Sequence, residues 1–179
     1  MNILKFYITG GTQSFLMKLI EKHQDEGLVL MQNEDQFILI HQSEGDSFFK
    51  TPRKYEVIAS HGKFPETGFA AFHHIPVSDE GRPLFEYHFK NQASLLEKEH
   101  DLMAIRVLRP LSSDTYLIIT IWKHELSYKN WKPAKSFEEA YTKTDAGIEA
   151  KALPKVFPRP SFLKRYTIVK ADEIYGHAD

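Results

Sequence analysis

The residues of this chain that are best suited to chemistry are a histidine pair and two large aromatic residues. His73 and His74 are adjacent in an apolar segment, and Trp131 and Tyr141 lie ten residues apart further along. Adjacent residues of a strand point to opposite faces of a sheet, so the two histidines cannot both line one site. We expect His74, Trp131 and Tyr141 to meet at an apolar pocket that suits a planar, partly polar ligand. Each of them alone is more often a core or surface residue, so the case for a site depends on all three together.

The commoner motifs for metals, nucleotides and nucleophiles are missing from the sequence. Its nine histidines include no H-E-x-x-H pair and no recognisable spacing of two histidines and a carboxylate, and the chain has no cysteine. Gly10-Gly11 follows a strand-like segment but lacks both the G-x-G-x-x-G pattern and a P-loop lysine. No serine lies in a nucleophile elbow. We therefore expect no disulfide, no thiolate metal site and no phosphate-binding loop.

Composition points to a cytoplasmic protein with a small-molecule partner. A net charge of −1 gives no electrostatic footprint for nucleic acid. The start of the chain lacks the pattern of a signal peptide, and no apolar run approaches the roughly 20 residues of a membrane helix. We expect a soluble, cytoplasmic protein without nucleic-acid or membrane partners. Thirteen Phe, eight Tyr and two Trp can fill a core or line a pocket for a large flat ligand.

The elements that must position these residues follow the split βαβ order. Apolar alternation predicts a strand over 69–77, and helical spacing predicts a helix from Ser78 or Asp79, with Pro83 in its first turn, to about residue 96. Strands over 101–110 and 115–123, a helical region interrupted at Pro133 and a strand over 162–169 complete the β-α-β-β-α-β pattern. His74 would lie on the first strand, and Trp131 and Tyr141 on the last helical region.

The first 67 residues predict nearly the same order. A strand over 3–9, a helix over 12–22, a hairpin of strands over 28–32 and 36–41, and a short helix from Thr51-Pro52 to about Ser60 give β-α-β-β-α. We therefore predict an α+β fold with two ferredoxin-like halves, residues 1–67 and 68–170, followed by a tail over 171–179. The halves would form a pseudo-dimer around a shared β-barrel, so we expect a monomer.

Three runs of the sequence resemble the antibiotic-biosynthesis-monooxygenase superfamily. They are EGRPLFEYHFKNQ (80–92), AIRVLRPLSSDTYLIITIW (104–122) and PRPSFLKRY (158–166). Within the superfamily, the chain resembles the two-part HmoB type of the IsdG-like haem-degrading monooxygenases and the related TRAP proteins of staphylococci. The similarity covers about residues 6–169 and implies ferredoxin-like units paired across a barrel.

The resemblance also implies a haem site. The haem degraders of this family use an Asn, a Trp and an axial His, and these positions hold His74, Trp131 and Tyr141 here. Tyr141 is thus the implied ligand of the haem iron, as a phenolate, and His74 is the alternative ligand. The apolar neighbours that we expect around the haem are Phe72, Phe89, Ile119 and Phe137.

Because two of the three catalytic positions differ, three functions stay open. The first is oxygen-dependent haem degradation, with iron release and an external electron donor. The second is non-catalytic haem binding or a stress-related role of the TRAP kind. The third is a cofactor-independent monooxygenase that acts on an aromatic substrate.

Overall fold

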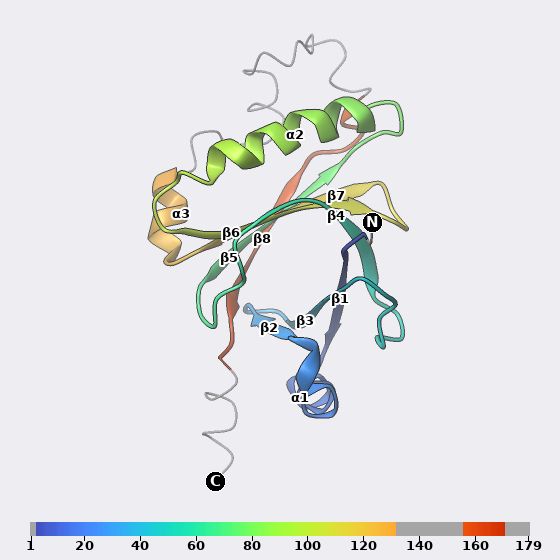
Figure 1. The fold of residues 1–179 in the computed structure, drawn as a ribbon, viewed down its shortest axis with the longest axis vertical. Coiled ribbons are helices and arrows are strands. Elements are labelled where there is room, and N and C mark those ends of the chain that lie inside the picture. The colour runs from blue at the N-terminus through green and yellow to red at the C-terminus, as the bar shows by residue number, and fades with distance from the viewer. Residues whose placement is uncertain (1–2, 132–155, 171–179) are drawn as a thin grey trace.

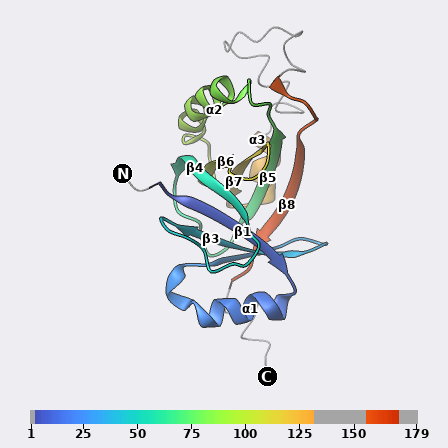
Figure 2. The same cartoon turned by 90° about the vertical axis from the view of Figure 1, so that its right-hand side faces the viewer.

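Eight strands of the chain close into one antiparallel barrel, and helices pack against its outside (Figures 1 and 2). The computed structural model describes residues 3–131 and 156–170. The strands are β1 (Lys5–Gly11), β2 (Val29–Gln32), β3 (Phe37–Ser43), β4 (Arg53–His61), β5 (Phe69–Pro76), β6 (Leu102–Pro110), β7 (Thr115–Trp122) and β8 (Phe162–Ile168). The helices are α1 (Gln13–Lys22), the short 3-10 helix η1 (Gln24–Glu26), α2 (Arg82–Leu96) and α3 (Glu125–Trp131).

The order of strands around the barrel is β1-β3-β2-β8-β5-β7-β6-β4. The four strands from residues 1–67 therefore lie together, and the four from 68–170 lie together, joined at β2–β8 and β4–β6. Helix α2 crosses the outer side of the barrel at one end, and α1 lies at the opposite end (Figure 1). The predicted α+β, ferredoxin-like class and the shared barrel are confirmed. No helix in the described ranges is long and apolar enough to cross a membrane.

One predicted element is wrong: residues 51–60 form no helix. Arg53–His61 is strand β4, which pairs with β1 on one side and with β6 on the other. Thr51-Pro52 resembles the start of a helix. As a strand, however, residues 53–61 form backbone hydrogen bonds with both β1 and β6, and a helix here would leave the facing edges of those two strands without these hydrogen bonds. A bulge between Val57 and Ala59 interrupts the alternation that would have marked the strand.

The barrel interior is filled by apolar side chains from every strand. Its buried residues include Phe6, Met31, Ile38, Tyr55, Phe72, Ala104, Ile119 and Tyr166. Outside the barrel, one apolar cluster lies between α2 and the sheet, a second lies under α3, and a third lies under α1. Both faces of β5 are covered, because all eight of its residues are buried.

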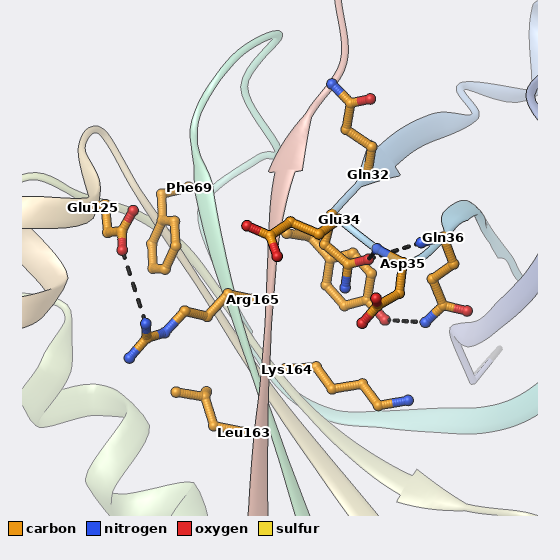
Figure 3. Close-up of a pocket in the computed structure, with 11 residues that line it drawn as sticks. Gln32, Glu34, Asp35, Gln36, Phe69, Glu125, Leu163, Lys164 and Arg165 are labelled. Atoms are coloured by element: carbon orange, nitrogen blue, oxygen red, sulfur yellow. Dashed lines mark hydrogen bonds and ion pairs between the residues drawn. The ribbon is translucent and has the colours of Figure 1, made fainter.

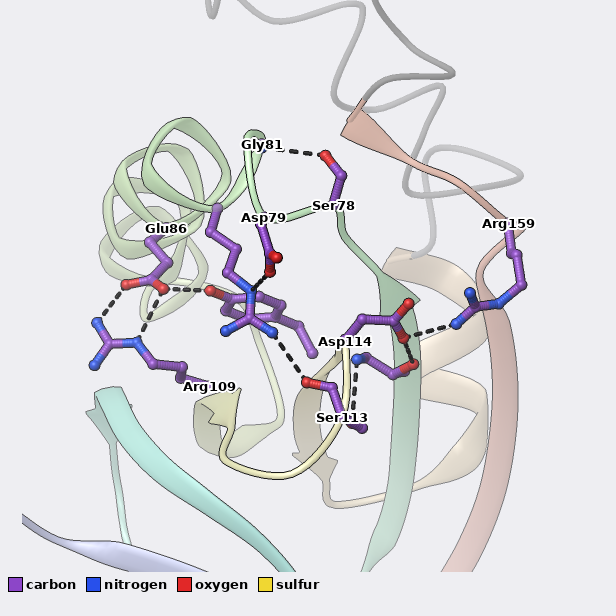
Figure 4. Close-up of polar contacts among 11 residues, drawn as sticks. Ser78, Asp79, Gly81, Glu86, Arg109, Ser113, Asp114 and Arg159 are labelled. Carbon is purple, nitrogen blue, oxygen red and sulfur yellow. Dashed lines mark hydrogen bonds and ion pairs between the residues drawn. The ribbon is translucent and has the colours of Figure 1, made fainter.

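Helix α2 is fixed to the barrel by charged groups (Figure 4). The Arg109 guanidinium on β6 donates to the Glu86 carboxylate on α2 at 2.9 and 2.5 Å and to Glu56 on β4 at 2.8 Å. The Tyr116 hydroxyl also donates to Glu86. Although burial raises the pKa of Glu86, the hydrogen bonds from Arg109 and Tyr116 hold it below its usual value. The helix is thereby held at a fixed position over β6 and β7.

The start of α2 is close-packed against the segment before β8. Helix α2 begins at Arg82 with Gly81 as its N-cap, so the predicted cap, Ser78 or Asp79, is wrong, although Ser78 Oγ accepts a hydrogen bond from the Gly81 amide at 3.1 Å. A Cβ atom on Gly81 would lie 2.9 Å from Val156 Cγ1. The glycine therefore permits a contact that any larger residue would prevent.

The shortest strand pairing in the barrel is the one between β2 and β8. Strand β2 pairs with β8 at only two positions, Met31–Ile168 and Gln32–Thr167. Residues 162–166 of β8 pair with β5 alone. One edge of β8 is therefore left facing the β2–β3 turn.

Candidate functional site

Strand β5 places its two histidines on opposite sides of the barrel wall. His73 shares the outer face with Ala71 and Ile75, which belong to the clusters under α3 and α2. Its ring centroid lies 5.9 Å from that of Tyr128 on α3. His74 shares the inner face with Phe72, and its ring stacks on Phe162 at 4.6 Å. Only His73 therefore faces the helices.

Helix α3 brings two aromatic residues to the same outer face. Tyr128 is fully buried, while Trp131, the last residue of α3, is half-buried. The Trp131 ring lies 5.3 Å from the Trp122 ring and 6.2 Å from that of Tyr128. The Trp122 indole is held by a 2.9 Å hydrogen bond from its Nε1 to Thr120 Oγ1. We call His73, Trp122, Tyr128 and Trp131 the aromatic site.

The Tyr128 hydroxyl of the aromatic site can form a hydrogen bond with a ligand. The Tyr128 hydroxyl is buried and has no hydrogen-bond partner within the ranges that the structure covers. Burial raises the pKa of Tyr128, so the phenol stays protonated and can donate a hydrogen bond at neutral pH. An imidazole, two indoles and a phenol donor at one apolar face suit a planar ligand with a polar or metal-bearing centre.

A second buried imidazole, His88, lies on α2 beside the same face. It is 8% exposed, and its ring packs edge-on against Phe89 at 4.8 Å. Burial lowers the pKa of His88, which favours the neutral form. Neutral imidazole is the form that ligates metal ions.

The structure separates the residues that the sequence grouped into one pocket. His74, Phe72 and Ile119 point into the barrel, whereas Phe89 packs under α2 and Trp131 lies on α3. The expected pocket between the His74 side chain and the helices therefore does not form, because the sheet lies between them. Tyr141 and Phe137 lie outside the residues that the structure describes.

Sequence reasoning missed His73 and Tyr128. Tyr128 lies three residues before Trp131, a spacing that puts neighbouring side chains on one side of a helix. That spacing was a usable signal for Tyr128. No comparable signal distinguished His73 from His74, since both faces of β5 are buried.

A groove of about 930 Å³ lies elsewhere, between the β2–β3 turn and β8 (Figure 3). Its lining residues are Gln32, Asn33, Glu34, Asp35, Gln36, Phe69, Glu125, Leu163, Lys164, Arg165 and Tyr166. Five of the eleven lining side chains are charged, three negative and two positive, and Arg165 lies 4.0 Å from Glu125. The groove is thus too polar to be the apolar slot that a haem needs. Within the residues described, no group of three or more His, Asp or Glu side chains could hold a metal ion.

Comparisons with known proteins connect the chain to two kinds of relative. It is 26% identical over 135 residues to a "Heme-degrading monooxygenase" of Listeria monocytogenes serovar 1/2a, covering 75% of this chain and 81% of the relative. It is 29% identical over 137 residues to the "Signal transduction protein TRAP" of Staphylococcus epidermidis, covering 76% and 82%. The chain is a homologue of both. No family model matches it.

A solved structure has the same fold as this chain. A ferredoxin-fold protein related to antibiotic biosynthesis monooxygenases, from Listeria monocytogenes 4b F2365, superposes with a TM-score of 0.75. The superposition covers 94% of this chain and 95% of that protein, at 22% identity. At this identity the likeness establishes the ferredoxin-like fold, and the function has to be argued from the site.

Proposed function

We propose that this protein binds haem at the aromatic site, between the outer face of β5–β7 and helices α2 and α3, and that it degrades the bound haem. The observation that carries the proposal is the convergence of His73, Tyr128 and Trp131 on one apolar face. The homologue named for haem degradation supports the choice of ligand.

The residues of the aromatic site fit a haem in three respects. The floor is apolar, since Phe69 and Ala71 lie at the surface of β5 under α3. The indoles of Trp122 and Trp131 can pack against a porphyrin plane. The buried Tyr128 hydroxyl offers a hydrogen bond that nothing described accepts. These features belong to a site that excludes water from a flat ligand.

The axial ligand is proposed from two candidates. Tyr141 holds the position that family resemblance implies, and a tyrosinate ligates haem iron in some proteins. His73 is the candidate that geometry favours, because it faces α3, where its ring lies 5.9 Å from that of Tyr128, whereas His74 stacks on Phe162 on the other side of the sheet. Bound haem would supply the iron and the porphyrin on which oxygen-dependent cleavage acts, and an external donor would supply electrons. The chain itself would bind and orient the haem and exclude water.

A second candidate function is haem binding without degradation. It is favoured by the identity to TRAP, which is similar in extent to that with the haem-degrading relative. It is also favoured by Tyr141, because a phenolate ligand lowers the reduction potential of haem iron and opposes reduction to the ferrous state.

Titration of the full chain with hemin tests both candidates. The proposal expects a Soret band that saturates at one haem per chain and then decays when ascorbate is added under air. A band that persists under ascorbate supports the second candidate. A chain that produces no Soret band at micromolar concentrations contradicts both.

Single substitutions then identify which face of β5 binds the haem and which residue ligates its iron. His73→Ala is expected to shift the Soret band and to weaken hemin binding at least several-fold if His73 is the ligand, and Tyr141→Phe should do so if Tyr141 is. His74→Gln is the matched comparison on the opposite face of the same strand, and it should leave the spectrum unchanged. A change confined to His74→Gln would contradict the aromatic site.

A further inference from the structure

His74 is a buried imidazole on the side of β5 that the haem proposal does not use. The residue is 3% exposed, and Nε2 has no hydrogen-bond partner within the described residues. The half-exposed Phe162 ring stacks on it at an interplanar angle of 5° and separates it from solvent. A buried polar atom without a partner is destabilising, so its presence needs a reason.

Two cations lie close to this imidazole. Arg53 is the first residue of β4 and points to the same inner side as Tyr55, and Lys164 lies on the inner side of β8, between Phe162 and Tyr166. Burial, Arg53 and Lys164 together lower the pKa of His74 to about 4. Neither cation forms an ion pair with any carboxylate among residues 3–131 and 156–170. The end of the barrel around His74 therefore carries two positive charges that form no direct ion pair within the described residues.

Tyr166 adds a further hydrogen-bond donor at this end of the barrel. Its hydroxyl accepts from Gln36 Nε2 at 2.7 Å, and no described group accepts the hydroxyl proton. Burial raises the pKa of Tyr166, and Arg53 acts against that rise. Arg53 is thus near both Tyr166 and His74. The acidic group that acts on Tyr166 is Asp35, which is exposed on the β2–β3 turn.

We propose that this end of the barrel binds a small oxyanion, a phosphate or a carboxylate. Arg53 and Lys164 would supply the positive charge, and His74 Nε2 and the Tyr166 hydroxyl would supply hydrogen bonds. We call these four residues the basic end. Lys164 and Tyr166 also line the groove beside the β2–β3 turn, so the basic end adjoins that groove (Figure 3). The basic end lies across the barrel wall from the aromatic site, so this proposal does not depend on haem binding.

The groups facing His74 determine how the site should respond to pH. Arg53 and Lys164 are the cationic side chains that act on His74, and Phe162 and Leu117, its partners on β8 and β7, are apolar. Asp35, which acts on Tyr166, and Glu34 are acidic groups that line the adjoining groove. A bound anion favours protonated His74 and so raises its pKa. Binding should therefore be tighter at pH 5 than at pH 8.

Calorimetric titration of the full chain with sodium phosphate and, separately, sodium acetate tests the proposal. We expect saturable binding of at least one of them at pH 6, and the arm that saturates identifies phosphate or carboxylate as the ligand chemistry. Sodium chloride at equal ionic strength is the control, and an equal response to chloride would mean simple screening and would overturn the proposal.

Two charge-matched variants distinguish a site from a general surface potential. Lys164→Met is expected to weaken anion binding at least tenfold, whereas Lys54→Met, at an exposed position on the outer side of β4, should change binding by less than threefold. Equal losses in the two variants would overturn the proposal. The circular dichroism spectrum of each variant verifies that it is folded.

Proton NMR of the His74 ring gives a readout that is independent of these variants. Saturating anion should raise the pKa of His74 by at least one unit in the wild-type protein. An unchanged titration in a sample that binds the anion would place that ion elsewhere and would contradict the basic end.

Discussion

Replacing His74 with glutamine should remove a loss of stability that the wild-type protein shows in acid. The folded protein holds the pKa of His74 at about 4, against 6.5 for the unperturbed group. Between these two values the unfolded chain binds a proton that the folded chain does not. The free energy of unfolding therefore falls as pH decreases from 6.5 to 4, and this effect is absent above pH 6.5.

The size of the effect follows from the pKa difference. One pKa unit corresponds to about 1.4 kcal/mol, so a difference of about 2.5 units corresponds to about 3 kcal/mol at pH 4. Glutamine keeps a polar side chain at the site but does not titrate. The free energy of unfolding of His74→Gln, measured relative to that of the wild type, should therefore rise by about 3 kcal/mol between pH 7.5 and pH 4.

Urea unfolding in chloride buffers at the two pH values measures the effect. His124→Gln is the matched control, because His124 is exposed at the start of α3 and should follow the wild-type pH dependence. The reasoning fails if His74→Gln and wild type lose the same stability between pH 7.5 and pH 4. In saturating phosphate the wild-type loss should also shrink, because a bound anion raises the pKa of His74.

Five further substitutions test the fold and the site. Arg109→Met should lower the free energy of unfolding in urea by about 2 kcal/mol, because three charge-assisted hydrogen bonds between α2, β6 and β4 are lost. Gly62→Ala should lower the free energy of unfolding by at least about 3 kcal/mol, because its Cβ would lie 2.1 Å from a carbonyl oxygen of β6. Gly27→Ala, which is also at positive φ but in open space, should lower it by about 1 kcal/mol. Tyr128→Phe should change the free energy of unfolding by less than about 0.5 kcal/mol, because the Tyr128 hydroxyl has no partner among the described residues. Tyr116→Phe should lower it by about 1–2 kcal/mol, because the Tyr116 hydroxyl donates to Glu86.

Local patterns in the sequence predicted most of the barrel. The strands that carry clean alternation or a short apolar run, such as Phe69–Pro76 and Thr115–Trp122, were found within one residue of their ends. Helix α2 was predicted from its apolar spacing and from Pro83 in its first turn, although its N-cap is Gly81 rather than Ser78 or Asp79. Strand β4 was missed because its partners lie far away in sequence and a bulge disturbs its period.

The candidate site was harder to predict because it depends on which face of β5 meets the helices. Alternation normally separates an inner from an outer face, but here His73 and His74 are both buried. The choice between them is made by register with β7 and β8 and by where α3 packs. Those are long-range properties, so a single sequence does not show which of the two histidines faces α3.

The short β2–β8 seam has a consequence for how the barrel forms and opens. Its two residue pairs join positions more than 130 residues apart, so closing it removes a large amount of chain entropy for few hydrogen bonds. Contacts of such high sequence separation form late in folding, after local hairpins such as β6–β7. The same seam is the place where the barrel separates at lowest free energy, and amide exchange along β2 and the C-terminal end of β8 should outpace exchange in β5 and β7. The N-terminal strands should therefore separate from the rest of the barrel, at the β2–β8 pairing, before the C-terminal strands separate from one another.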